Sequence, residues 1–184
     1  GSRPRLPRHP GPPDGTVAAL MARRLTLAAL PLKMGASGFL CFSWPMLPDA
    51  SRAFTPMMVT LSIIAIIYGA YMALAQVDLK KLIAYSSVSH MGFVMLGIAT
   101  LTSFGINAAV FGMVAHGLIT GMLFFIAGSI QERFGTRELS RLGGLLLQAP
   151  RMGWMLGFCA FASLGLPGLA GFWGEFPAIL SAYQ

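Results

Sequence analysis

Charged side chains are scarce in this sequence. Asp, Glu, Lys and Arg make up only 10% of its 184 residues, whereas 55% of the residues are hydrophobic. A soluble domain carries about 25% charged residues. The shortage therefore argues against a soluble domain and favours a protein whose surface faces lipid.

Acidic residues are the rarest charged type, with six against 13 Lys and Arg, which gives a net charge of +7. Five arginines fall in residues 1–24, a basic and proline-rich segment that we expect to be irregular. No apolar stretch there leads to a small-residue cleavage site, so we expect no cleavable signal peptide. Most other basic residues fall in short gaps between apolar runs, as in membrane loops. We therefore expect a lipid bilayer, and no nucleic acid, as a partner.

Cysteine is also rare, and both Cys41 and Cys159 lie in apolar runs. This placement favours neither a disulfide nor a metal site. The sequence has no cysteine cluster for iron–sulfur binding, no haem ligand pattern and no glycine-rich dinucleotide loop after a strand. It therefore predicts no cofactor and no catalytic redox residue in this chain.

Long uncharged runs are abundant, and a spanning helix needs roughly 20 such residues. The run 82–131 is too long for one helix, and "LTSFGIN" (101–107) supplies a turn inside it. Residues 25–184 are therefore predicted to form an all-α, polytopic transmembrane helix bundle. Its five expected helices are 25–44, 54–77, 82–100, 107–130 and 152–184.

Basic residues are distributed unevenly between the loops of this bundle. The loops "VDLKK" (77–81) and "QERFGTRELSR" (131–141) lie on one side, because two helices separate them. The opposite side carries only Arg52 in "PMLPDASRA" (45–53). An excess of Lys and Arg marks the cytoplasmic side, so we expect the first two loops to be cytoplasmic.

Four titratable side chains remain inside the apolar helices: Lys33, His90, His116 and Glu175. The first three lie about 12–14 Å into a hydrocarbon core about 30 Å thick, near its midplane. A charge at that depth costs about 2.5–3.5 kcal/mol, so such groups face the bundle interior, pair with one another or contact water.

The chemical interpretation of these four groups is a proton path. Lys33 and His90 would relay a proton, His116 would continue the relay, and Glu175 would hold the proton before release on the periplasmic side. Other polar side chains could order water along it: Ser86, Ser87, Ser89 and Thr120. For each histidine alone, a structural hydrogen bond between helices explains the residue equally well.

The stretch "GLPGLAG" (165–171) predicts a break in the last helix. Pro167 lacks a backbone donor, and the neighbouring Gly168 and Gly171 weaken the helix further. A break at membrane depth is tolerated only where protein or water satisfies the freed backbone groups. Transporters use such breaks to place helix ends at an ion site.

Three long motifs carry a resemblance to a known family. They are "ALAQVDLKKLIAYSSVSHMGFVMLGI" (73–98), "MVAHGLITGMLFFIAGSIQERFGTRELSRLGGL" (113–145) and "LGLPGLAGFWGEF" (164–176). Together they resemble the antiporter-like membrane subunits of respiratory complex I, and within that family the M type, the counterpart of mitochondrial subunit 4.

The resemblance implies a partial antiporter-like fold, with the five helices matching the family's eighth to twelfth and the last one discontinuous. It places Lys33 of "LKMG", His90 of "SVSHMGF", His116 of "HGL" and Glu175 of "GEF" on the family's proton-transfer positions. Sister subunits often carry lysine where Glu175 stands, and this difference favours the M type.

The resemblance further implies a proton-translocating membrane subunit of NADH:quinone oxidoreductase, in the respiratory chain of a bacterial inner membrane. Its partners would be the other membrane subunits of the complex, including the sister antiporter-like subunits. NADH, FMN, iron–sulfur clusters and quinone would bind to partner subunits, where electron transport takes place.

The first 30 residues depart from the family pattern, which would read "LPDAH" and "APTAGS" before the lysine. We expect a disrupted reading frame or an incomplete gene model there, and a fragment that cannot form a complete channel alone. Three alternatives fit the same features: a subunit of a multisubunit cation/proton antiporter, a membrane-bound hydrogenase or formate hydrogenlyase, and a nonfunctional fragment. Neighbouring genes would separate the first two from complex I.

Overall fold

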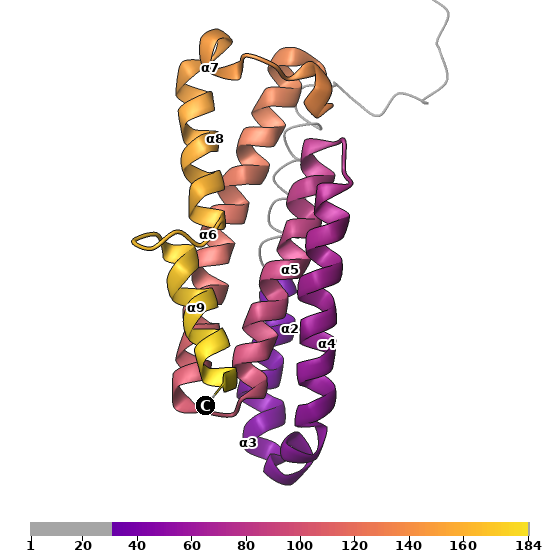
Figure 1. Ribbon diagram of the computed structural model, residues 1–184, viewed down its shortest axis with the longest axis vertical. Coiled ribbons are helices and arrows are strands. Elements are labelled where there is room, and N and C mark those ends of the chain that lie inside the picture. Colours follow the sequence, from indigo (N-terminus) through magenta and orange to yellow (C-terminus); the bar gives the residue numbers. More distant parts are fainter. Residues whose placement is uncertain (1–30, 184) are drawn as a thin grey trace, which may run out of the picture.

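The computed structural model describes residues 31–183 of the chain. The basic segment 1–24, the departure from the family pattern and the start of the expected helix 25–44 lie outside these residues. The described chain consists of helices joined by turns (Figure 1), with one isolated bridge between Asp78 and Glu138.

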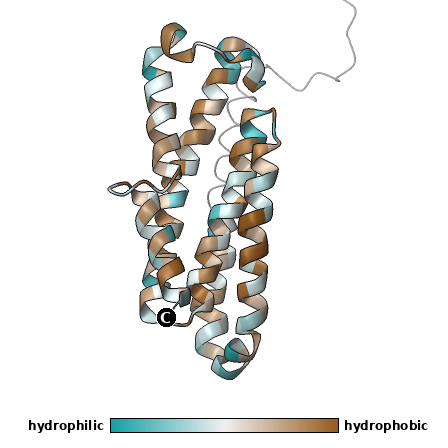
Figure 2. Ribbon diagram, in the orientation of Figure 1, coloured by the Kyte–Doolittle hydropathy of each residue, from teal (hydrophilic) through white to brown (hydrophobic). Residues whose placement is uncertain are grey.

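Among residues 31–183, three helices are long and apolar enough to cross a membrane. They are α4 (Pro48–Leu74), α5 (Leu79–Ala99) and α6 (Ser103–Phe134). Together with the broken last span, which is divided into two half-helices, they form the predicted all-α membrane bundle, so the expected fold class is confirmed. Figure 2 shows many of the hydrophilic residues in the loops at the two ends of the bundle.

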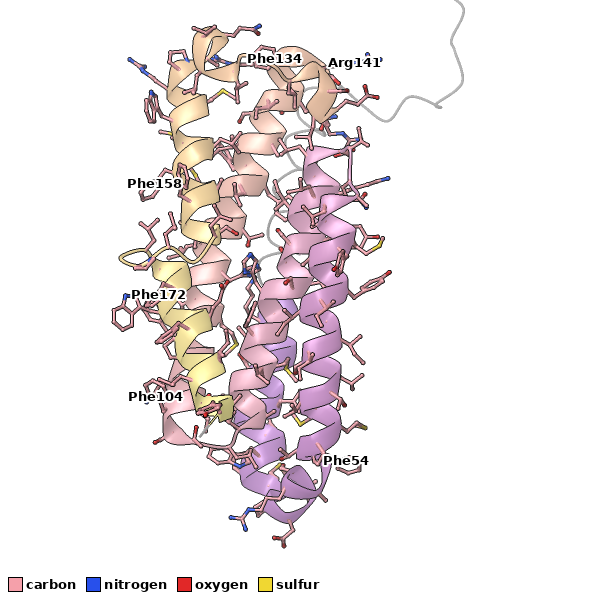
Figure 3. All side chains as sticks on the ribbon, viewed as in Figure 1. Phe54, Phe104, Phe134, Arg141, Phe158 and Phe172 are labelled. Carbon is pink, nitrogen blue, oxygen red and sulfur yellow. The ribbon has the colours of Figure 1, made fainter. Side chains whose placement is uncertain are left out.

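The outer surface of the bundle is apolar. Phe54, Phe104 and Phe158 are labelled in Figure 3 and are exposed. On α4, the outward-facing side chains Leu61, Ile64 and Ile67 are each more than half exposed. Such a surface suits lipid or other apolar helices rather than water.

The first described span is irregular. It comprises α2 (Pro31–Gly38), a π-helical turn (Phe39–Ser43) and the short α3 (Trp44–Met46). The next helix, α4, begins at Pro48 rather than at the expected residue 54. Proline is favoured at the first position of a helix. The negative charge of Asp49 in the first turn interacts favourably with the positive end of the helix dipole.

Side-chain caps explain why α5 and α6 are longer than expected. Asp78 accepts a hydrogen bond from the backbone N–H of Lys80, and α5 begins three residues before the expected Leu82. Thr102 accepts one from the N–H of Gly105, and α6 begins at Ser103. The helix α6 ends at Phe134, and the next residue, Gly135, has a left-handed φ of 67°.

The two basic loops expected on one side of the membrane are in contact. The N–H of Leu79 donates to the carbonyl of Arg137, and the N–H of Leu139 donates to the carbonyl of Val77. The Arg137 guanidinium Nε lies 3.5 Å from Asp78 Oδ2. A 3₁₀ turn (Leu139–Arg141) and α7 (Leu145–Gln148) then lead to the last span.

The last span is divided into α8 (Pro150–Ser163) and α9 (Ala170–Tyr183), each of 14 residues. Each half is about 21 Å long, too short to cross the hydrocarbon core alone. The loop between them protrudes from the bundle (Figure 1) and contains Pro167. Gly165 and Gly168 have positive φ values of 68° and 95°, which glycine adopts without strain.

One expected break residue is placed differently by the structure. Gly171 lies in the first turn of α9, so the break spans residues 164–169 rather than 165–171. A Cβ at Gly171 would collide with the carbonyl oxygen of Ala162 in α8. Gly171 is therefore small because the two half-helices approach closely, and the prediction that it breaks the helix was wrong.

Glycine also permits the contact between α9 and α6. A Cβ at Gly174 would lie 2.7 Å from the Cα of Gly112 on α6. Backbone atoms cannot move aside as a flexible side chain can, so this contact fixes the separation of the two helices. Glu175 follows Gly174 directly, and its position therefore depends on this packing.

Replacing Gly174 by Ala should push α9 away from α6 and destabilise the protein by about 1–3 kcal/mol, as overpacking does. Thermal unfolding of the purified membrane assembly would measure the loss. Gly157→Ala on α8 is the matched control, because a Cβ there meets nothing within 4 Å. Equal stability of the two variants would contradict the tight α6–α9 contact.

Candidate functional site

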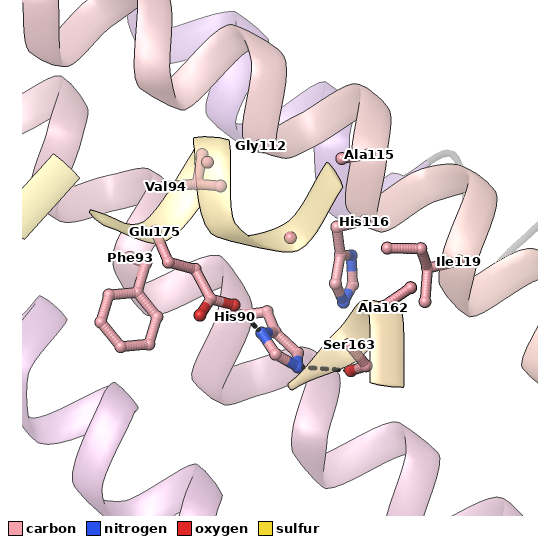
Figure 4. A pocket seen from close by; sticks show the side chains of 12 residues that line it. His90, Phe93, Val94, Gly112, Ala115, His116, Ile119, Ala162, Ser163 and Glu175 are labelled. Atoms are coloured by element: carbon pink, nitrogen blue, oxygen red, sulfur yellow. Dashed lines mark hydrogen bonds and ion pairs between the residues drawn. The ribbon is translucent and has the colours of Figure 1, made fainter. Parts of the chain in front are cut away.

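His90 is the centre of the candidate site. It lies about 16 Å along α5, a helix about 31 Å long, and so at mid-height. Its Nδ1 is 2.6 Å from Oε1 of Glu175 on α9, and its Nε2 is 2.9 Å from Oγ of Ser163 on α8. Figure 4 shows both contacts, which link α5 to each half of the broken helix.

His116 on α6 extends this cluster. Its ring centroid lies 5.3 Å from that of His90, with the two planes inclined by 47°. Its Nε2 is 3.0 Å from the hydroxyl of Thr120, one turn further along the same helix. The His116 side chain is buried, and its Nδ1 has no hydrogen-bond partner among the described residues.

Lys33 on α2 lies close to the part of α6 that carries His116. Its Cε lies 3.9 Å from the point where a Cβ of Gly117 would stand, and Gly117 follows His116 directly. The ammonium nitrogen is buried and has no partner within the described part of the chain. Lys33 is close enough to interact electrostatically with His116.

The four predicted side chains therefore gather from four different elements, α2, α5, α6 and α9. The contacts also give an order that differs from the expected one. His116 interacts with both Lys33 and His90, and of these three side chains it is His90 that contacts Glu175. The sequence alone could not rank His90 and His116, because both lie at a similar depth.

A small cavity lies between His90, His116, Ser163 and Glu175, and its volume is about 20 Å³. One water molecule requires about 10–15 Å³ and two or more polar partners. The imidazoles, the hydroxyl and the carboxylate around the cavity supply these partners. Among residues 31–183, no group of three or more His, Cys, Asp or Glu could hold a metal ion.

The break in the last span lies directly against the side chain of Glu175. A Cβ at Gly165 would lie 2.9 Å from Oε2 of Glu175, so a larger residue there would displace the carboxylate. One oxygen of Glu175 thus faces His90 and the other faces the break. Pro167 and Gly168 lie further out in the protruding loop, and a Cβ at Gly168 meets nothing within 4 Å.

The serines expected to order water have other partners. The hydroxyls of Ser86 and Ser87 donate to the carbonyl of Ile83 in their own helix, and that of Ser89 donates to Ile66 on α4. Ser163, which was not predicted from the sequence, reaches the site instead. The available signal was its position just before "LGLPG", since the ends of half-helices face the site in broken spans.

Comparison with known proteins shows the family of this chain. Residues 6–184 match the family model described as NADH:quinone oxidoreductase/Mrp antiporter, transmembrane. The chain belongs to this family. Subunit M of the NADH-quinone oxidoreductase of Rickettsia bellii is 42% identical to it, and that of Rhodobacter capsulatus is 45% identical. The NADH-ubiquinone oxidoreductase chain 4 of Chondrus crispus is also 45% identical.

Each of these alignments covers 98% of this chain. The chain spans little more than a third of the relatives' length, namely 37%, 35% and 37% respectively. The predicted resemblance to the M type of the antiporter-like family is confirmed by these names. The chain is therefore a multi-pass membrane member of the NADH:quinone oxidoreductase/Mrp antiporter family.

Replacing Gly165 by Ala should separate Glu175 from His90, because the new methyl group would occupy the space of the carboxylate. Gly168→Ala is the matched control, since it incurs a similar left-handed backbone penalty of about 1–2 kcal/mol without that collision. Structures of the two variants would measure the Glu175–His90 distance. An unchanged 2.6 Å contact in the Gly165 variant would contradict the prediction.

Proposed function

We propose that this chain is part of the proton-translocating membrane subunit of an NADH:quinone oxidoreductase in a bacterial inner membrane. The observation that carries the proposal is the 2.6 Å contact between His90 and Glu175 at the break of the last span. Two of the relatives named above come from bacteria, and all three are named as subunits of this enzyme.

In the proposed mechanism a proton moves along the order Lys33, His116, His90, Glu175. Each of these side chains can bind and release a proton when its surroundings balance its charged and neutral forms. No hydrogen bond joins the two imidazoles among the described residues, and both nitrogens of His90 already have partners. One water in the adjoining cavity would therefore pass the proton from His116 to the Nε2 side of His90, where the Ser163 hydroxyl lies. The unpartnered Nζ of Lys33 and Nδ1 of His116 are the other sites where water would bind.

Glu175 is the terminal group of this path. It accepts the proton across the short contact from His90, holds it as a neutral acid and releases it toward the periplasmic side. The break next to Gly165 places the carboxylate beside backbone that is not part of a helix. Freed backbone groups of this kind can bind ions and water at membrane depth, which suits an exit for protons.

The proposal assigns all redox chemistry to partner subunits. NADH, FMN, iron–sulfur clusters and quinone would bind there, and sister antiporter-like subunits would lie beside this one in the membrane. This chain would contribute proton-transfer groups and the helices that position them. Its enzymatic role is thus that of a translocating part of the oxidoreductase.

A second candidate is a subunit of a multisubunit cation/proton antiporter. The family description covers Mrp antiporters as well as the oxidoreductase, and this observation favours the alternative. Genes for quinone-module subunits beside this one would support the oxidoreductase, whereas antiporter genes would support the alternative.

Replacing Glu175 by Gln in the assembled complex should lower proton pumping at least about a hundredfold, as loss of an acid–base group does. Glutamine keeps the shape of the side chain, so the complex should still assemble. Proton uptake per electron, measured with a pH-sensitive dye in membrane vesicles, would test this.

The matched control for this experiment is Glu132→Gln, which removes an exposed carboxylate at the end of α6. Pumping by the control should equal that of the unmodified complex. A normal ratio of protons to electrons in an assembled Glu175→Gln variant would show that the proton path does not pass through Glu175.

A further inference from the structure

We propose that Ser163 is a positioning residue of this proton path, which holds His90 against Glu175 in both protonation states of the imidazole. The inference rests on the proposed function and adds to it a residue and a role that neither the sequence motifs nor the family resemblance supplied. It assigns a task to the end of α8, the half of the broken helix that carries no acid.

The geometry of His90 is the first argument. Glu175 contacts its Nδ1 from α9, and Ser163 contacts its Nε2 from α8. The imidazole is therefore held at both nitrogens, each by a different half of the broken span. If only one contact were present, the ring could rotate away from the carboxylate.

The behaviour of the other serines is the second argument. Serine in a helix commonly bonds to a carbonyl three or four residues earlier in the same helix. Ser86, Ser87 and Ser181 do so. Ser89 bonds to a backbone carbonyl on α4. Ser163 instead directs its hydroxyl across to α5, at 2.9 Å from His90. It occupies the last position of α8, where the chain leaves the helix.

The chemistry of the hydroxyl is the third argument. The ionised carboxylate of Glu175 accepts a hydrogen bond, so neutral His90 carries its proton on Nδ1 and accepts from Ser163 at Nε2. When His90 gains a proton, Nε2 becomes a donor and the Ser163 oxygen must accept. A hydroxyl does both by rotation, so the link survives each proton transfer.

The charged and titratable surroundings of His90 are consistent with this role. Glu175 faces it from α9, His116 from α6, and Lys33 lies beyond His116 on α2. In α8, Cys159 belongs to a separate apolar cluster, and α4 contributes no residue to the lining of the cavity. In the part of the chain that the structure describes, Ser163 is thus the polar partner that α8 offers to this histidine.

The decisive experiment compares Ser163→Thr with Ser163→Val in the assembled complex. These side chains have the same shape, and only threonine has a hydroxyl. The Val variant should pump about tenfold more slowly than the Thr variant, the effect of losing one hydrogen bond of ordinary strength. Its pH profile of pumping should also be displaced, because a hydrogen bond between the hydroxyl and the charged imidazolium is stronger than one to the neutral ring.

A second pair of variants tests the inference if the branched variants assemble poorly. Ser163→Ala removes the hydroxyl without adding atoms, and Ser87→Ala removes a buried hydroxyl that bonds only within α5. The Ser163 variant should show the slower pumping and the displaced profile, whereas the Ser87 variant should show neither. A displaced profile is not expected from a role in packing alone.

The outcomes separate this inference from the proposed function. If Glu175→Gln abolishes pumping but the Val and Thr variants pump alike, with unchanged profiles, the role of Ser163 is overturned and the proton path stands. If the Glu175→Gln variant pumps normally, both proposals fail. Slow pumping by the Val and Ala variants with an undisplaced pH profile would assign Ser163 to packing and overturn the inference.

Discussion

The short contact between His90 and Glu175 is the interaction on which the arrangement of this bundle depends. A charged side chain at the centre of a bilayer costs about 2.5–3.5 kcal/mol unless it finds a partner. Here the acid and the imidazole satisfy each other at 2.6 Å, and they come from helices far apart in sequence. The close approach of Gly174 to Gly112 holds α9 at the distance that this contact requires.

The break in the last span follows from the same constraint. In a continuous helix the side chains surround the backbone, so only side chains could lie beside the carboxylate. Gly165 has a positive φ, which glycine adopts without strain, and a side chain there would displace the carboxylate of Glu175. Ser163, two residues earlier, then points to the other nitrogen of His90. The half-helices on the two sides of this turn thus each contact one nitrogen of the imidazole.

Much of this architecture was predictable because its causes are local. The uncharged runs around Ile66, Val94 and Ala115 predicted helices, and Pro167 with its glycines predicted a break in the last one. Helix ends were less accurate, since Pro48 and the caps Asp78 and Thr102 extend the helices beyond the apolar runs. Gly171 was wrongly assigned to the break. It must be small because it packs against Ala162, a residue nine positions earlier that belongs to the other half-helix.

By itself, the sequence determined the fold class, the family and which four titratable residues lie within the apolar runs, because the lack of charge and the order of motifs can be read without coordinates. Only the tertiary structure decided how these groups meet. In the structure His116 lies between Lys33 and His90, and His90 contacts Glu175. Ser163, which no motif singled out, also contacts His90. These pairings depend on how the helices are rotated and how far apart they lie. Close contacts between glycines far apart in the chain fix this arrangement of the helices.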